Sequence, residues 1–265
     1  MTTQEPIRRG AEASALSDDA GRSEMLGRLR QTLDRVAEGR FSDLEEKPAV
    51  ASWSRVGHYS RAGEAVKDVI DRVLATFGLL LISPLLLGVA LAVKLDSPGP
   101  AFFRQTRIGR GGRPFTFWKF RGMYVDAKER FPDMYDYRYS ADQLQNLRFH
   151  PGEDPRVTRV GLFIRRTSLD ELPNLLNVIT GDMSLVGPRP EIPELIPYYG
   201  RSAKTVLSVK PGITSLAKLV GRDNITFQET LEFDLRYIRE RCLRVDLGIL
   251  FGTVWMVLTG RSVGH

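Results

Sequence analysis

The hydrophobic pattern of the chain is dominated by one uncharged run, from Val73 to Val93. It contains 21 residues, and only Thr76 and Ser83 among them carry a polar side chain. A helix of this length covers the hydrocarbon core of a bilayer. A buried helix of a soluble protein would be expected to carry polar residues on at least one face. The pattern therefore predicts a helix inserted in a membrane.

The centre of this run and its two flanks indicate how the helix is placed. Pro84 follows Ser83 at the centre, and a proline there removes a backbone donor and bends the helix. The Ser83 hydroxyl is an available donor for a carbonyl left without a partner. Both flanks are basic, with Arg55, Arg61, Lys67 and Arg72 on one side and Lys94, Arg104, Arg107, Arg110 and Arg113 on the other. Since positive residues favour the cytoplasmic side, we expect a re-entrant hairpin, with a simple span as the alternative.

The pattern divides the chain into three segments. Residues 1–60 are polar and are expected to form a partly disordered tail with no secretory signal sequence. A short amphipathic helix is expected in this tail, either docked loosely or bound to a partner or the membrane, from the spacing of Met25, Leu26, Leu29, Leu33 and Val36. Residues 61–100 contain the membrane helix and residues 101–265 a cytosolic domain. The expected fold class is one mostly helical α/β domain with the re-entrant helix and a flexible tail.

Two shorter stretches of the domain also point to a membrane. Leu247–Leu258 is uncharged but only 12 residues long, so it predicts a core helix or one lying in the interface. Ala101–Val125 has six basic residues and no acidic one, interleaved with aromatics, and Phe115–Arg121 within it predicts a strand. Such a mixture can clamp nucleic acid. Because the apolar run is adjacent, we favour the lipid headgroup layer and expect no nucleic-acid partner.

Composition narrows the possible partners and chemistry. The 265 residues are 42% hydrophobic and 26% charged, which is ordinary for a folded protein. The net charge of +6 suits an anionic partner, although a solvated basic face gives the same sum. A single cysteine excludes an internal disulfide and a cysteine-cluster metal site, and the three histidines are too scattered for a metal triad.

The candidate chemistry lies between Asp154 and Pro190. This segment contains an adjacent acid pair, Asp170 and Glu171, and it also contains Arg156, Arg159, Arg165, Arg166 and Arg189. Two readings of the acids remain open. Ser168 and Glu171 have capping-box spacing, so the acids could be structural. Alternatively, a helix start surrounded by arginines is an anion site, in which a carboxylate can attack phosphorus while Mg²⁺ or Mn²⁺ offsets the repulsion. Asp170 and Glu171 are then the candidate metal ligands.

A series of ordered motifs carries a resemblance to a known family. They are Lys67-Asp68-Val69-x-Asp71-Arg72, Ser83-Pro84, Ser97-Pro98-Gly99-Pro100, Phe102-Phe103-Arg104-Gln105-x-Arg107-x-Gly109, Lys119-Phe120-Arg121, Asp154-Pro155-Arg156-x-Thr158-Arg159, Ser168-Leu169-Asp170-Glu171-Leu172-Pro173, Gly181-Asp182-Met183-Ser184-Leu185-Val186-Gly187-Pro188-Arg189-Pro190 and Lys210-Pro211-Gly212-Ile213-Thr214. From about Lys67 onward the chain resembles the bacterial sugar transferases, monotopic polyprenyl-phosphate phosphoglycosyl transferases that initiate glycoconjugate and exopolysaccharide assembly.

The resemblance implies a reaction and a place for it. A nucleotide diphospho-sugar, with UDP as the expected nucleotide, would give its sugar phosphate to Asp170, and polyprenyl (undecaprenyl) phosphate would collect it in a ping-pong mechanism. Asp170 maps onto the nucleophile and Glu171 onto its partner acid, while Arg165 and Arg189 map onto phosphate-binding positions. The protein would lie in the bacterial inner membrane, with its helix broken at Ser83-Pro84 and its catalytic domain on the cytoplasmic face. A homodimer is compatible with the sequence.

Departures from the family pattern leave some questions open. Gly122 stands where the family commonly has Thr or Ser, and Ser215-Leu-Ala-Lys218-Leu-Val220-Gly221-Arg222 stands where Gly, Gln and Asn are usual. The sugar is therefore not specified by the sequence. Two other functions remain as alternatives, a non-enzymatic basic membrane adaptor and a nucleotide-sugar hydrolase.

Overall fold

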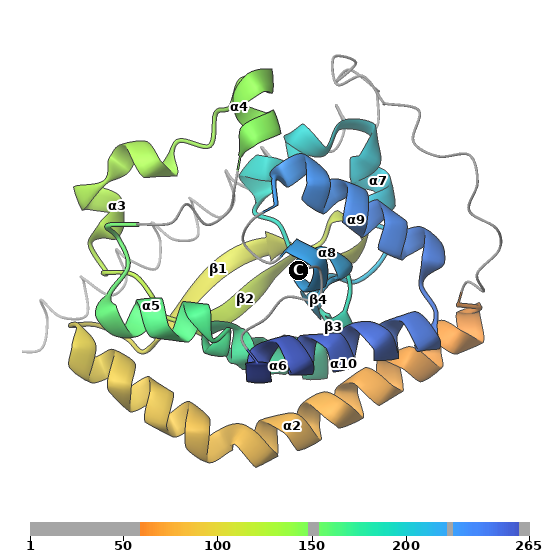
Figure 1. Cartoon of the computed structure of the whole chain (residues 1–265), viewed down its shortest axis with the longest axis horizontal. Helices are drawn as coiled ribbons and strands as arrows, with labels where there is room; N and C mark the ends of the chain where they lie inside the picture. The colour runs from red at the N-terminus through yellow and green to blue at the C-terminus, as the bar shows by residue number, and fades with distance from the viewer. Residues whose placement is uncertain (1–58, 148–153, 222–224, 260–265) are drawn as a thin grey trace, which may run out of the picture.

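The computed structural model describes residues 59–147, 154–221 and 225–259. The predicted helix is α2 (Arg61–Asp96), 36 residues long, which begins where the Ser60 side chain accepts a hydrogen bond from the Gly63 amide. In Figure 1 α2 runs beneath the rest of the molecule as a shallow V whose two arms rise toward the folded part. Pro84 lies inside it, and a proline is the usual cause of such a bend.

The two arms of α2 both pack on the folded part of the molecule, whereas its middle does not. Lys67, Asp71 and Ala75 are buried in the first arm, and Val89 and Val93 in the second. The exposed apolar residues between and beside them include Phe77, Leu80, Leu81, Leu85, Leu87 and Leu91. By length and composition α2 is the one described helix that could cross a membrane, and only 11% of its most apolar window is buried. That exposure distinguishes it from the core helix of a soluble protein.

After α2 the chain forms an antiparallel hairpin of β1 (Phe102–Ile108) and β2 (Pro114–Phe120), joined by η1 (Arg110–Gly112). Strand β2 matches the strand predicted from the aromatic–basic alternation. Two asparagine side chains from later in the chain form hydrogen bonds with the backbone of β2. The Trp118 amide donates to Asn174 Oδ1 over 3.1 Å, and Asn177 Nδ2 donates to the Thr116 carbonyl over 2.7 Å. The hairpin is thereby held beside η3 (Leu169–Asn174) and α6 (Leu175–Thr180).

The remaining elements pack around the hairpin and the η3–α6 segment. Two three-residue strands, β3 (Ser184–Val186) and β4 (Gly212–Thr214), pair in parallel. Gly212 is required there, because a Cβ at this position would lie 2.1 Å from the Gly187 amide nitrogen. The helices of the domain are α3 (Ala127–Arg130), η2 (Pro132–Tyr135), α4 (Ala141–Asn146), α5 (Arg159–Arg166), η4 (Pro193–Ser202), α7 (Ala203–Val206), α8 (Leu216–Gly221), α9 (Phe227–Glu240) and α10 (Leu243–Thr259).

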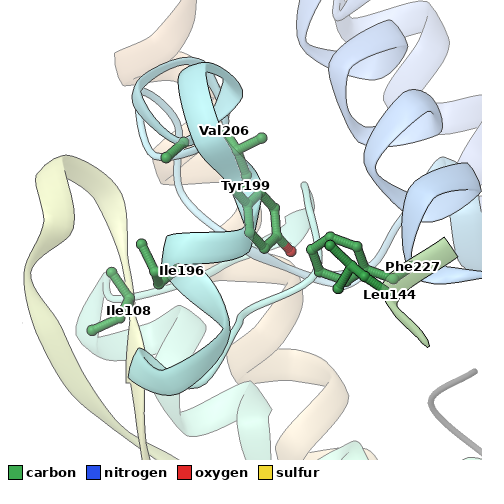
Figure 2. Close-up of a cluster of buried hydrophobic side chains, with 7 residues drawn as sticks. Ile108, Leu144, Ile196, Tyr199, Val206 and Phe227 are labelled. Atoms are coloured by element: carbon green, nitrogen blue, oxygen red, sulfur yellow. The ribbon is translucent and has the colours of Figure 1, made fainter. Parts of the chain in front are cut away.

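A buried apolar cluster joins the hairpin to the C-terminal helices. Figure 2 shows Ile108 from β1 near Ile196 and Tyr199 of η4, with Phe227 of α9 beyond them. The rings of Tyr199 and Phe227 meet edge to face with centroids 5.1 Å apart. Next to this cluster the Ile108 amide donates to the Glu191 carbonyl over 2.9 Å. The cluster thus fixes the loop from Pro188 to Glu191 against the end of β1.

The expected fold class is confirmed at the coarse level, because the described chain is mostly helical with two small sheets. Helix α10 is longer than the uncharged run suggested, and it exposes Leu247, Phe251, Val254, Trp255 and Val257 while Ile249 and Met256 are buried. It therefore has both a core side and an open apolar side. The predicted tail and its amphipathic helix lie outside the described residues.

Candidate functional site

One cavity of about 110 Å³ brings the acid pair together with basic side chains from distant segments. Its walls come from the hairpin, from η3, from the loop after β3, and from β4 with α8. In Figure 1 the strands β3 and β4 and helix α8 lie between α9 and α10, and the β1–β2 hairpin lies beside them to the left. The charged residues that line the cavity are Arg107, Lys119, Arg165, Asp170, Glu171, Arg189 and Lys218.

The acids stand on η3, and the capping box that the spacing of Ser168 and Glu171 left open is not formed. Ser168 has a left-handed backbone with φ 57° and its side chain makes no capping hydrogen bond. The turn that follows is a 3-10 helix containing Asp170 and Glu171, and α6 starts only after Pro173. A non-glycine residue with positive φ is uncommon and marks a position held by its surroundings. Both carboxylates of the turn that follows line the cavity.

Asp170 is a buried carboxylate, with 9% of its surface exposed. Burial, and then the charge of Glu171, raise the pKa of Asp170 to about 6, although Lys119, Lys218 and Arg165 act in the opposite direction. Within the described part of the chain the Asp170 carboxylate makes no hydrogen bond or ion pair. Its oxygens are therefore available to a ligand.

Glu171 has the opposite environment. Burial alone would raise its pKa, but the charge and hydrogen bond of Lys218, followed by Arg189 and Lys119, lower the pKa of Glu171 to about 2. The Lys218 ammonium contacts Glu171 Oε2 directly. Two neighbouring carboxylates whose pKa values are pushed apart are suited to different tasks. Glu171 stays ionised, whereas Asp170 titrates near neutral pH.

The hairpin contributes two basic residues that our reading of the acid-pair region did not single out. Lys119 and Arg107 stand on the same face of the hairpin as Phe117, and all three line the cavity. Burial, and then the charge of Arg107, lower the pKa of Lys119 to about 8. Arg107 donates to the Pro190 carbonyl over 3.0 Å and so holds the loop that carries Arg189. Both residues lie in motifs on which the family resemblance rests, and this was the sequence feature that could have identified them as site residues.

Arg189 is oriented by two buried carboxylates. Its Nε lies 3.2 Å from Glu191 Oε1, and its amide donates to Asp234 Oδ2 over 3.2 Å. Glu191 also faces Arg107, with Arg107 Nη1 3.9 Å from Glu191 Oε2. The side chain of Arg189 keeps 30% exposure toward the cavity side. The loop in which Pro188 and Pro190 flank Arg189 is thus held by two carboxylates, those of Glu191 and Asp234.

The structure separates the predicted arginines into two groups. Arg165 and Arg189 line the cavity, while Arg156, Arg159 and Arg166 do not. Arg156 binds Asp154, with Nη2 to Oδ2 at 2.8 Å, and covers the ring of Tyr135. Arg159 and Arg166 are exposed at the two ends of α5. Successive residues of a helix point about 100° apart, so only Arg165 of the adjacent pair faces the cavity.

The neighbouring carboxylates of Asp170 and Glu171 are donors of the kind that a magnesium or manganese ion binds. Across residues 59–147, 154–221 and 225–259, no group of three or more histidine, cysteine or acidic side chains forms a ready-made metal cage. Asp170 offers hard carboxylate oxygens that have no hydrogen-bond or ion-pair partner among the described residues, and Glu171 lies beside it. Mg²⁺ commonly binds through one or two carboxylates together with phosphate oxygens.

Comparison with known proteins decides the family. A family model described as bacterial sugar transferase matches residues 62–260. This chain belongs to the bacterial sugar transferase family. The transferase class expected from the motifs is therefore confirmed, and the non-enzymatic adaptor loses its support.

Several curated relatives of this sugar transferase are similar over most of its length. Galactosyl transferase CpsE of Streptococcus agalactiae is 38% identical over 86% of this chain and 50% of its own. The UDP-glucose:undecaprenyl-phosphate glucose-1-phosphate transferase of Escherichia coli K12 is 45% identical over 83% of this chain and 46% of its own. Exopolysaccharide production protein ExoY of Rhizobium meliloti is 38% identical over 76% and 88%. The chain thus spans about half the length of the first two and most of the third.

Proposed function

We propose that this sugar transferase moves a sugar 1-phosphate from a nucleotide diphospho-sugar, with UDP as the nucleotide, to undecaprenyl phosphate. The observation that carries the proposal is the unpaired, buried carboxylate of Asp170 in a cavity lined by five basic side chains. A carboxylate held among cations is suited to attack an electrophile that is itself anionic. The names of the Escherichia coli relative and of a Salmonella typhimurium relative, an undecaprenyl-phosphate galactose phosphotransferase, support the same reaction.

The first half-reaction forms a covalent intermediate on Asp170. A carboxylate oxygen attacks the phosphorus that carries the sugar, and the bond from this phosphorus to the oxygen bridging the two phosphates breaks. The electron pair leaves with the nucleoside monophosphate, UMP for a UDP-sugar. An acyl phosphate that bears the sugar remains on Asp170. Since the pKa of Asp170 is about 6, most of this group is ionised at neutral pH and needs no base.

The second half-reaction regenerates the carboxylate. A phosphate oxygen of undecaprenyl phosphate attacks the same phosphorus, the phosphorus–oxygen bond to Asp170 breaks, and a polyprenyl diphospho-sugar is released. Arg165, Arg189, Lys119 and Arg107 would neutralise the phosphates in both steps, because their charges stand around the two acids. We expect ping-pong kinetics because Asp170 carries the sugar phosphate after the first product has left and before the second substrate reacts.

A divalent cation would be held by the Asp170–Glu171 pair and by phosphate oxygens. When bound, Mg²⁺ or Mn²⁺ supplies Lewis-acid stabilisation of the charge that develops on the leaving phosphate. The protein's own part is to hold the two carboxylates on one turn, and to surround them with cations that lower the repulsion between carboxylate and phosphate.

The membrane placement that we propose is a re-entrant segment of residues 61–100, which contains α2, below a cytoplasmic domain formed by residues 101–265. Two sets of contacts support it. In the first arm, Lys67 pairs with Asp246 of α10 at 2.8 Å. In the second arm, Asp96 accepts a hydrogen bond from the Val160 amide of α5 over 3.1 Å. A straight helix of 36 residues would separate its ends by roughly 54 Å, so attachment of both arms to one folded unit favours the bend and a single membrane face.

One assay tests the reaction directly. Purified protein is incubated with a panel of nucleotide-sugars and Mg²⁺, with and without undecaprenyl phosphate, and both monophosphate release and the lipid product are measured. The transferase yields lipid-linked diphospho-sugar in amounts equal to the monophosphate released. Multiple turnovers of monophosphate release without the lipid would instead identify a nucleotide-sugar hydrolase and overturn the proposal.

A further inference from the structure

Lys218 is a cavity residue that the acid-pair motif does not include. It reaches Glu171 from α8, which is 47 positions away along the chain. The backbone around it is well fixed. The Lys218 amide donates to Ser215 Oγ over 3.0 Å, and neighbouring Leu219 packs in a core cluster with Val186 and Tyr237. The ammonium is thus presented to Glu171 by a packed element and not by a free surface chain.

The Lys218 ammonium contacts Oε2 of Glu171, one of the two oxygens that this carboxylate could offer to a metal. The two side chains are only 23% and 28% exposed, so solvent screens the pair less than it screens a surface salt bridge. An ammonium on a carboxylate repels a second cation at the same oxygens, and at about 4 Å this repulsion is large wherever water is partly excluded. Asp170, one residue earlier, has no such partner in the described chain.

We propose that the Lys218 ammonium acts as an internal cation for Glu171. It keeps a divalent metal ion from binding the acid pair until the ion arrives as a complex with a diphosphate. Lys218 is therefore a positioning residue, acting through Glu171. The cavity already contains five basic side chains against two acids, so a free metal ion meets net repulsion, and a metal–diphosphate complex does not. This inference rests on the proposed function for the identity of the diphosphate, but not for the metal affinity itself.

The inference can be tested by direct metal titration of the full chain in detergent without any nucleotide. Mn²⁺ serves as the probe, and its bound fraction is read from the electron paramagnetic resonance signal of the free ion. Lys218→Met removes charge and donor at nearly constant length, and we expect it to tighten Mn²⁺ binding at least about tenfold. Lys218→Arg keeps the cation and should bind Mn²⁺ as weakly as the wild type.

Two further variants separate blocking of Glu171 from a general change of charge. Lys119→Met removes one cavity cation that acts on Glu171 through its charge and, in the described part of the chain, makes no hydrogen bond or ion pair with it. Its effect should therefore be clearly smaller than that of Lys218→Met. Adding Glu171→Gln to Lys218→Met should abolish the gain. Equal tightening by both methionine variants, or tight Mn²⁺ binding by the wild type, would overturn the inference. Monophosphate release, measured in parallel, reports on the proposed reaction independently.

Discussion

Ser83 donates its hydroxyl hydrogen to the Leu80 carbonyl over 2.8 Å, and this is the carbonyl that Pro84 cannot serve. In a helix each amide donates to the carbonyl four residues earlier, so a proline at position 84 leaves that of Leu80 without its usual donor. Inside lipid no water can take its place. The pair Ser83-Pro84 therefore bends α2 while keeping the Leu80 carbonyl satisfied.

This relationship gives a topology prediction. Single cysteines at exposed Arg61 and Arg113, in a Cys242→Ser background, should both resist an impermeant thiol reagent added to intact cells, because both arms of α2 attach to one domain. With Ser83→Leu and Pro84→Leu together, the bend is no longer imposed. The cysteine at position 61 should then become labelled in part of the population while the one at 113 stays protected. Labels on opposite sides in the native protein would rule out the re-entrant helix but leave the catalytic proposal intact.

The nucleophile prediction concerns Asp170. Asp170→Asn should lower monophosphate release by several orders of magnitude, as loss of a covalent nucleophile usually does, without changing membrane association. Asp133→Asn, which alters an exposed carboxylate far from the cavity lining, is the matched control and should retain activity. If Asp170→Asn keeps a tenth of the wild-type rate or more, another group is the nucleophile.

The pH dependence follows from the raised pKa of Asp170. Pre-steady-state release of monophosphate should rise about tenfold per pH unit below pH 6 and level off above it, as Asp170 ionises. Glu171→Gln removes a charge that raises this pKa, so the midpoint should move to lower pH. Lys119→Met removes a charge that lowers it and should move the midpoint to higher pH. Shifts in the same direction for both variants would contradict this electrostatic account.

Stability should change with pH through the same group. The folded-state pKa of Asp170 is about 6 and its ordinary value is 3.8, so above pH 6 the ionised carboxylate destabilises the folded protein. Asp170→Asn should therefore raise the free energy of unfolding by on the order of 1 kcal/mol or more at pH 8. The gain should shrink as pH falls and vanish below about pH 4, where both states bind the proton. Denaturant titrations in detergent at pH 4 and pH 8 measure it.

The metal prediction needs no mutation. An excess of chelator should stop monophosphate release, and Mg²⁺ added beyond the chelator should restore it, because a divalent cation would offset the repulsion between the diphosphate and the two carboxylates. Ca²⁺ is a useful control, since it binds oxygen ligands with longer bonds and looser geometry. Undiminished release in excess chelator would mean that the five basic side chains suffice alone.

The sequence by itself determined the local features of this protein. The bent apolar helix follows from 21 uncharged residues around Ser83-Pro84. Strand β2 follows from the alternation of aromatic residues with other residues in its own short segment. The motifs around Asp170 also identified the family, which the family match confirmed. Such features depend on residues that are close together in the chain. Hydrophobic periodicity and the steric effect of proline act between such neighbours, so the sequence alone reveals them.

The tertiary structure decided which side chains meet. Ser168 has the spacing of a helix cap, yet its left-handed backbone is set by the packing of η3 against β2 and α5. Arg165 faces the cavity and Arg166 does not, because the orientation of α5 selects one of them. Lys218 reaches Glu171 across 47 positions only after α8 has packed on its neighbours. Burial and long-range charge set the pKa values of Asp170 and Glu171 apart, and neither exists until the chain has folded.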